Sequence, residues 1–252
     1  MTKTSKKLYG SVLLKAADIL DTLAKQGGKS LQQLSSETEI TTSNLSKILE
    51  TLMYIGYVIR DADKLYYLGS KFLEYQTQNI EAQRLLAISR PCLEKLQKTV
   101  DETVHLSVLE NNKVVYIDKL EPSNKALYMS SRVGLSRDLY STGMGKAVLS
   151  SFSADALDKY LSETKLIAKA KNTITDQKIL KENLALIRQR GYSVDDEEQE
   201  NDGYCIAVKI EDNRKVVGAL SVSFPKFRYT EEYAQKVIDE INKAKLEIEK
   251  QM

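Results

Sequence analysis

The sequence has few of the residues that build metal sites and disulfides. Its 252 residues include one histidine, His105, and two cysteines, Cys92 and Cys205. A zinc site of the usual Cys and His composition needs about four such ligands, so we expect no metal site and no cofactor. The two cysteines lie far apart and are typical of free thiols in a reducing compartment.

Long apolar runs and a large net charge are also missing. No apolar run approaches the roughly 20 residues that cross a bilayer, and the charged N-terminal segment does not resemble a signal peptide. We therefore expect a cytoplasmic protein. The net charge is +2, and this whole excess lies within residues 1–75. So small an excess does not by itself indicate a nucleic-acid partner.

Three helical patterns and a hairpin follow one another near the start of the chain. Apolar residues recur at helical spacing in 11–27, 30–39 and 41–58, and glycines end the first and third patterns. Val12 and Leu13 are expected on the inner face of the first helix. Two short alternating strands then flank Asp61-Ala62-Asp63. This order predicts a winged helix-turn-helix.

The third helix begins with short polar side chains, which suit contact with a DNA duplex. Hydroxyl and amide groups near a helix N-terminus can reach base edges and phosphates. Two hairpin cations could contact phosphates or enter a minor groove. The candidate DNA-binding residues are Thr42, Ser43, Asn44, Ser46, Lys47, Arg60 and Lys64. The alternative is a protein-binding module with the same topology.

The rest of the chain indicates a second domain. Residues 74–100 are helical with an expected break at Pro91, because proline removes a helix hydrogen bond but suits the first turn of a new helix. We therefore expect a DNA-binding domain at 1–73, a linker helix at 74–90 and an effector-binding domain at 91–252. Mixed strands and helices after Thr103 predict an α+β fold, a sheet with helices on its faces.

The segment "YSTGMGKAVLS" (140–150) contains a Gly-x-Gly-Lys run that superficially suggests a phosphate loop. A Walker loop needs glycine at position 140 and a hydroxyl residue at 147, but the chain has Tyr140 and Ala147. Val148 breaks the dinucleotide fingerprint. The glycines of a turn before a helix can instead let backbone N–H groups approach a carboxylate or phosphate. The alternative is tight packing of the turn against the sheet.

The segment "GYSVDDEEQENDGYC" (191–205) carries a run of acids. In an extended strand Asp195 and Glu197 share one side. Most acid runs are solvated, which is the leading interpretation for a second group: Asp196, Glu198, Glu200 and Asp202.

Three other residues of this region suit a buried site. Cys205 is expected to be a small buried thiol. Ser221 and Ser223 have period-2 spacing and share a face. A nucleophilic enzyme needs a base beside serine or cysteine, and His105 on its strand is expected to be half-buried and structural. Catalysis by Cys205 and His105 is therefore disfavoured.

Three motifs together resemble the IclR family of bacterial transcriptional regulators. They are "LMYIGYVIRDADKLYYLGSKFLE", "VGLSRDLYSTGMGKAVLS" and "GYSVDDEEQENDGYCIAVKI" with "GALSVSFPKFRYT". The resemblance spans about residues 9–248. It implies a winged helix joined by a linker helix to a GAF-like effector-binding domain, assembled as a homodimer or a dimer of dimers. It also implies effectors that are small organic, aromatic or sugar acids.

The resemblance also assigns an effector pocket. Carried over by position, its residues are Leu135, Leu139, Gly143, Met144, Gly145, Asp195, Cys205, Ser221 and Ser223. The chain departs from the family pattern at five positions, which are Ser46, Asp138, Tyr140, Gly143 and Lys209. Gly143 stands where alanine is frequent.

The resulting hypothesis is a repressor that binds a palindromic or pseudo-palindromic DNA operator and is controlled by a small carboxylic or sugar acid. Backbone N–H groups of 143–146, with Ser221 and Ser223, would accept the acid, and Asp195 would hydrogen-bond a ligand hydroxyl or exclude a ligand of the wrong charge. Two alternatives are a metabolite-binding enzyme that uses Cys205 and Asp195, and a protein-binding adaptor built on the winged helix.

Overall fold

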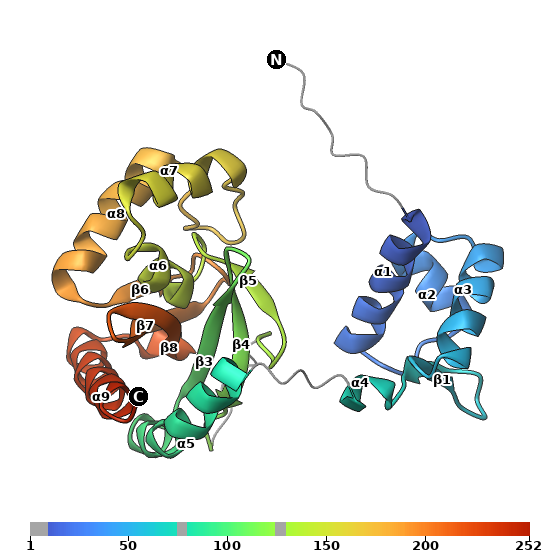
Figure 1. Ribbon diagram of the computed structural model, residues 1–252, viewed down its shortest axis with the longest axis horizontal. Coiled ribbons are helices and arrows are strands. Elements are labelled where there is room, and N and C mark those ends of the chain that lie inside the picture. The colour runs from blue at the N-terminus through green and yellow to red at the C-terminus, as the bar shows by residue number, and fades with distance from the viewer. Residues whose placement is uncertain (1–9, 75–79, 124–129) are drawn as a thin grey trace. The chain divides into compact units, whose positions relative to one another are not determined.

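The computed structural model describes residues 10–74, 80–123 and 130–252. The chain divides into two compact units, Met1–Gln78 and Asn79–Met252 (Figure 1). The smaller unit is a helix-turn-helix with a two-stranded wing, and the larger unit has a curled sheet with helices on both faces. The predicted α+β class is confirmed.

The smaller unit follows the predicted order of elements. Its elements are α1 (Ser11–Lys25), α2 (Leu31–Thr38), α3 (Thr42–Tyr54), β1 (Val58–Arg60), β2 (Tyr66–Leu68) and the short α4 (Lys71–Glu74). Ser30 caps α2 reciprocally with Gln33, because each side chain accepts a hydrogen bond from the other residue's amide. Glu39, in the left-handed conformation, ends α2 and turns the chain toward α3.

One apolar core holds the smaller unit together. Ile19, Leu34, Leu45 and Leu49 are completely buried in it. The inner face of α1 is shorter than the sequence pattern predicts, since Val12 and Leu13 are 54% and 71% exposed. The apolar spacing of α1 therefore continues one turn beyond the part of the helix that packs against α2 and α3.

The larger unit is built on a six-stranded antiparallel sheet. Its elements are α5 (Ile80–Val100), β3 (Thr103–Glu110), β4 (Lys113–Leu120), β5 (Ser136–Asp138), α6 (Gly143–Leu149), α7 (Ala154–Glu163), α8 (Gln177–Arg190), β6 (Ser193–Asp196), β7 (Gly203–Asp212), β8 (Lys215–Pro225), η1 (Lys226–Arg228) and α9 (Glu231–Glu249). The strand order is β5-β4-β3-β8-β7-β6. Asn111 and Asn112 both adopt positive φ in the β3–β4 turn, as a tight hairpin requires.

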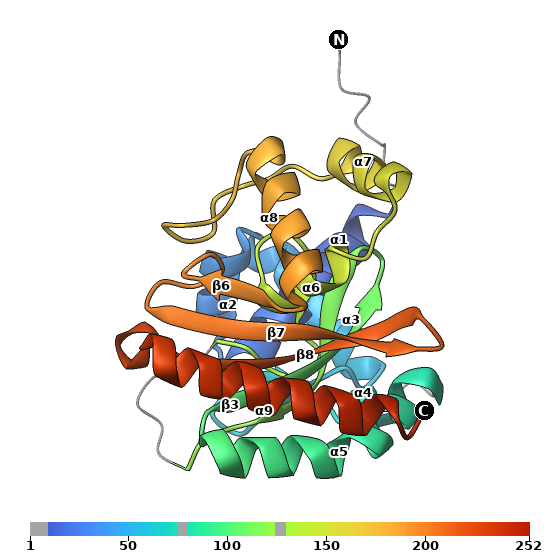
Figure 2. The same cartoon turned by 90° about the vertical axis from the view of Figure 1, so that its left-hand side faces the viewer.

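Helices cover the two faces of this sheet. In Figure 2, α5 and α9 run along one side, while α6 and α8 lie on the other. Alternate strand residues point to opposite faces. Val104, Ile206 and Val222 therefore join α5 and α9 in one core, whereas Ala207 and Ala219 face α6.

The predicted break at Pro91 is absent. Helix α5 runs without interruption from Ile80 to Val100 with Pro91 inside it. Its buried face continues on both sides of the proline, through Leu85, Leu93 and Leu96. The apolar burial therefore offsets the lost hydrogen bond. Residues 80–90 belong to the larger unit, and residues 75–79 of the predicted linker helix lie outside the described residues.

Candidate functional site

The polar face predicted on α3 lies on the surface of the smaller unit. Leu45, Ile48 and Leu49 face the core, so the residues between them turn outward. Four of the five predicted α3 residues are exposed, and Asn44 is half-buried. Thr41 occupies the N-cap position but its side chain makes no capping hydrogen bond. Thr41 is exposed at the same end of the helix as the predicted polar residues, and the sequence pattern did not single it out.

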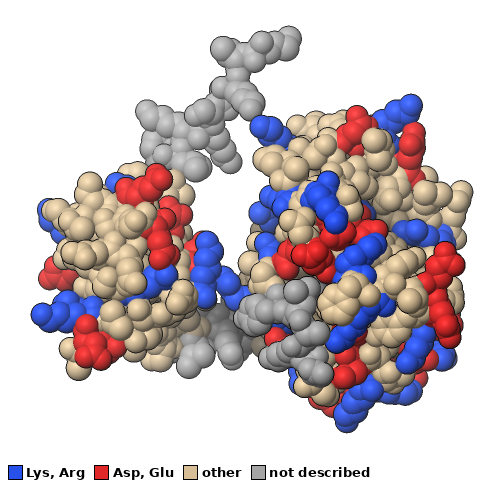
Figure 3. Space-filling model, turned by 180° about the vertical axis from the view of Figure 1, so that it is seen from behind, with Lys and Arg blue, Asp and Glu red and all other residues tan. Residues whose placement is uncertain are grey.

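Both predicted wing cations, Arg60 and Lys64, are exposed. The guanidinium of Arg60 lies 5.1 Å from the centre of the Tyr66 ring. Lys64 occupies the positive-φ position of the turn. Asp61 and Asp63 lie at the same tip, so the wing itself has no excess of positive charge. Figure 3 shows basic and acidic side chains interspersed over the face in view, which agrees with the small net charge.

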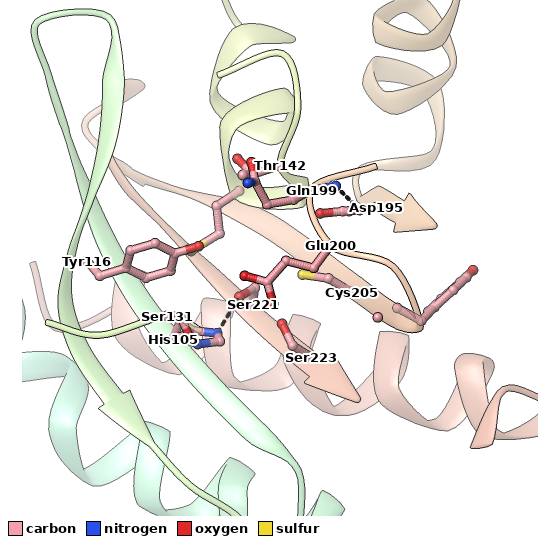
Figure 4. Close-up of a pocket in the computed structure, with 14 residues that line it drawn as sticks. His105, Tyr116, Ser131, Thr142, Asp195, Gln199, Glu200, Cys205, Ser221 and Ser223 are labelled. Carbon is pink, nitrogen blue, oxygen red and sulfur yellow. Dashed lines mark hydrogen bonds between the residues drawn. The ribbon is translucent and has the colours of Figure 1, made fainter. Parts of the chain in front are cut away.

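A pocket lies between α6 and the sheet in the larger unit, and we call it the sheet pocket (Figure 4). It is lined by His105, Tyr116, Ser131, Thr142, Gly143, Met144, Asp195, Gln199, Glu200, Gly203, Tyr204, Cys205, Ser221 and Ser223. No lysine or arginine is among these residues, and two carboxyl groups are.

Strand register explains why distant residues meet in the sheet pocket. Asp195 pairs with Cys205, and Cys205 pairs with Ser223, across three neighbouring strands. Ser221 pairs with His105 on the next strand. These side chains point toward α6, where Gly143 has no side chain, and a Cβ there would lie 3.1 Å from the Cys205 sulfur. Small residues on both surfaces therefore keep the space open.

The structure brings together six of the nine residues assigned to an effector pocket. Gly143, Met144, Asp195, Cys205, Ser221 and Ser223 all line the sheet pocket. The other three do not line it. Leu139 is completely buried in the core beneath α6, and Leu135 packs against that core. At Gly145 a Cβ would lie 2.4 Å from the carbonyl oxygen of Leu139, so this glycine serves close packing.

Only some of the backbone N–H groups expected to donate hydrogen bonds to an acid are free to do so. The hydroxyl of Thr142 accepts a hydrogen bond from the Gly145 amide at 3.0 Å. The Thr142 carbonyl accepts one from the Lys146 amide at 2.9 Å. Both therefore serve the first turn of α6. Neither Gly143 nor Gly145 has a positive φ, so the predicted glycine turn is an ordinary capped helix start.

Glu198 corrects the interpretation of the acid run. Strand β6 ends at Asp196, and Glu197 has a φ of +58°, so the strand alternation stops there. Glu198 turns inward and is 6% exposed. Its carboxylate pairs with the ammonium group of Lys146, which is completely buried. Asp196 and Glu200 remain near the surface, where they pair with Lys226 and Arg137.

Asp195 is the most perturbed acid of the sheet pocket. It is 7% exposed, and its Oδ1 accepts hydrogen bonds from the amides of Glu198 at 2.8 Å and Gln199 at 3.3 Å. Burial and the nearby charge of Glu198 raise the pKa of Asp195, these amides and Lys146 lower it, and the net result is a pKa of about 7. The group therefore titrates near neutral pH.

The histidine and the thiol of the sheet pocket are uncharged. Burial lowers the pKa of His105 to about 3. Its ring nitrogens lie 3.3 Å from the Ser221 hydroxyl and 2.7 Å from the Ser131 hydroxyl. Burial raises the pKa of Cys205 to about 12. Sequence reasoning treated His105 as structural, because its pairing with Ser221 joins two strands that lie far apart in the chain and leaves no local signal.

Neither a metal centre nor a membrane span emerges from the described part of the chain. Within residues 10–74, 80–123 and 130–252, no three His, Cys, Asp or Glu side chains gather as metal ligands would. Within the same ranges, no helix is both long and apolar enough to span a bilayer.

Comparison with known proteins relates both units to one group of regulators. The family model of the IclR helix-turn-helix domain matches residues 12–62, and that of the bacterial transcriptional regulator IclR C-terminal domain matches residues 77–250. The HTH-type transcriptional regulator KdgR of Escherichia coli is 34% identical over 96% of this chain and 92% of its own. The acetate operon repressor of Salmonella typhimurium is 30% identical over 94% and 88%.

A solved structure agrees with these relatives. The crystal structure of Thermotoga maritima IclR matches this chain with a TM-score of 0.75 and 35% identity, over 96% of this chain and 98% of that one. The similarity thus extends over both units.

Proposed function

Because this chain belongs to the IclR family of bacterial DNA-binding transcriptional regulators, we propose that it represses transcription from a DNA operator and that a small acid bound in the sheet pocket controls this repression. Repression is supported by the acetate operon repressor, which is 30% identical over 94% of this chain. The observation that carries the proposal is the presence in one chain of an exposed polar α3 face and a pocket lined by buried polar groups.

The α3 face and the wing support operator binding. Hydroxyl and amide side chains at the start of α3 suit base edges and phosphates, and Lys47, Arg60 and Lys64 suit phosphates. We propose that two copies of the chain bind two half-sites of a palindromic or pseudo-palindromic operator, because helix-turn-helix dimers match operator symmetry to their own. Phosphate contacts then make the affinity fall steeply with salt.

The sheet pocket supports control by a small organic acid or sugar acid. Ser221, Ser223 and Tyr116 supply hydroxyl groups, which can donate to carboxylate oxygens and accept from sugar hydroxyls. Asp195 faces the same space. An acid that prefers one conformation of the protein shifts DNA binding by its difference in affinity for the two conformations.

The pocket chemistry also supports a binding role in place of catalysis. A thiol with a pKa near 12 keeps its proton at neutral pH and is a poor nucleophile. Both ring nitrogens of His105 contact serine hydroxyls, those of Ser131 and Ser221, so His105 is not placed as a general base for the Cys205 thiol. We therefore propose that the acid binds in the sheet pocket and dissociates from it without being chemically changed.

A mobility-shift assay tests the DNA face. An operator is first selected from random duplex DNA with the wild-type chain. The variant Thr42→Ala/Asn44→Ala/Lys47→Ala is expected to bind it at least tenfold more weakly, because base and phosphate contacts contribute about 1–3 kcal/mol each. Lys178→Ala, an exposed lysine of α8 in the larger unit, is the control and should bind normally. Unchanged binding by the triple variant would refute the assigned face.

A further inference from the structure

The sheet pocket has a charge balance that an acidic effector must satisfy. The titratable groups that line the sheet pocket or lie beside Asp195 come from five elements: Lys146 on α6, Tyr204 and Cys205 on β7, Tyr116 on β4, His105 on β3, and Glu198 and Glu200 in the loop after β6. Each is either uncharged or already paired with an opposite charge, as the contacts below show.

Two ion pairs account for the charged neighbours. Lys146 pairs with Glu198 behind the pocket wall. Glu200 at the rim pairs with Arg137 at 3.3 Å and accepts a hydrogen bond from the Ser130 hydroxyl. Each pair contributes no net charge to the space inside.

The remaining neighbours hold their neutral forms. His105 is buried between two serine hydroxyls, and burial raises the pKa values of Tyr116, Tyr204 and Cys205. With Asp195 ionised, the pocket therefore has a net charge of −1 and no cationic side chain in its lining. A carboxylate entering this space would meet a second buried carboxylate, which is strongly unfavourable at low dielectric.

The geometry of Asp195 offers a way to remove this repulsion. Both backbone amides bond to Oδ1, and Oδ2 has no hydrogen-bond partner among the described residues. This oxygen belongs to a side chain that lines the pocket. A proton on Oδ2 would neutralise the residue and leave its two amide hydrogen bonds intact.

We propose that an acidic effector enters the sheet pocket together with one proton, which Asp195 takes from solvent on Oδ2 and donates in a hydrogen bond to the effector carboxylate. The effector carboxylate, the Asp195 carboxylate and one proton from solvent combine to form one hydrogen bond between a carboxyl group and a carboxylate. Such charge-assisted bonds are short and strong. The inference rests on the proposed function, since it takes the pocket to bind an acid.

Calorimetric titration of the full chain tests this coupling with three acids and their neutral amides. The acids are pyruvate, D-gluconate and 4-hydroxybenzoate, and the controls are pyruvamide, D-gluconamide and 4-hydroxybenzamide. At about pH 8, acid binding is expected to take up close to one proton, measured from the heats in buffers of different ionisation enthalpy. Affinity for the acid should fall about tenfold per pH unit above pH 7 to 8. The amides should show neither effect.

Two variants locate the proton. In Asp195→Asn, the side-chain NH₂ replaces the Oδ2 proton, so acid binding should continue without proton uptake and without pH dependence. Asp196→Asn is the matched control, because this neighbouring acid pairs with Lys226, and it should keep the wild-type proton uptake.

The opposite outcomes are distinct. Acid binding without proton uptake, or proton uptake that persists in Asp195→Asn, overturns the inference and leaves the proposed function standing. Absence of binding heat for all three acids at every pH from about 6 to 9 overturns the acid-effector part of the proposed function, and the inference falls with it.

Discussion

Asp195 shows at the scale of one residue how a buried acid in the sheet pocket costs stability. Its carboxyl group is buried beside Glu198, and two backbone amides and the charge of Lys146 offset the burial only in part. In the unfolded chain its pKa is near the ordinary 3.8, and in the folded protein it is about 7. Between these values the folded state holds more protons than the unfolded state, so the free energy of unfolding falls as pH rises from about 4 to 7.

Asp195→Asn should therefore stabilise the ligand-free protein at neutral pH. The amide keeps an acceptor oxygen for the two backbone N–H groups and carries no charge. We expect its free energy of unfolding to equal that of the wild type near pH 4 and to exceed it by up to about 4 kcal/mol at pH 8. Urea denaturation at several pH values measures this difference. A difference that stays constant over this range would contradict the raised pKa.

Helix α6 shows at the scale of one element how a short segment is fixed from two sides. Gly145 lets its start lie against Leu139. The Lys146 ammonium group then ties the helix to the loop after β6 through Glu198. Both side chains of this pair are almost completely buried, so neither charge can be hydrated if its partner is lost.

Breaking this pair from either side should be costly. Lys146→Met or Glu198→Gln is expected to lower the free energy of unfolding by about 3–5 kcal/mol, whereas the double variant Lys146→Met/Glu198→Leu should recover most of the loss. Lys181→Met, which breaks the exposed pair with Asp158, is the matched control and should cost less than about 1 kcal/mol. Chemical denaturation measures all four, and equal costs for the buried and exposed pairs would contradict this account.

The whole molecule consists of two units that each bury their own apolar residues. Ile19, Leu45 and Leu49 belong to the core of the smaller unit, and Ile206 and Leu220 to that of the larger one. Loss of apolar contacts in one unit does not remove contacts from the other core. The two units are therefore expected to respond separately to core substitutions.

Scanning calorimetry of the full chain should show two unfolding transitions. Leu49→Ala should lower the temperature of only one transition, and Ile206→Ala that of only the other. Each substitution should reduce the free energy of unfolding of its own unit by about 2–5 kcal/mol, because both side chains are completely buried. An acid that binds the sheet pocket should raise the temperature of only that transition which Ile206→Ala lowers. A single transition displaced by both substitutions would show that the units unfold together.

Local pattern was sufficient wherever one periodicity dominated. The polar start of α3 and the apolar faces of α2 and α3 follow from neighbours in sequence. Ser221 and Ser223 were placed on one face because strand side chains alternate. The family resemblance then added Asp195 and Cys205, which the structure brings into the same pocket.

Long-range packing decided the rest. A proline in isolation predicts a break, and α5 continues through Pro91 because its apolar face is buried on both sides. An acid run predicts solvation, and Glu198 is buried because Glu197 takes a left-handed conformation that turns it toward Lys146. His105 entered the pocket through its pairing with a strand more than a hundred residues away.

The sequence by itself determined the two-unit plan, the polar face of α3 and the family, because these depend on periodicity and on motifs within short segments. Only the tertiary structure decided which polar groups share one enclosed space and which charges are paired. Burial and partner distance set the charge of each group, and both arise only when strands and helices far apart in the chain come together. The sheet pocket and the raised pKa of its buried acid, Asp195, are products of that assembly.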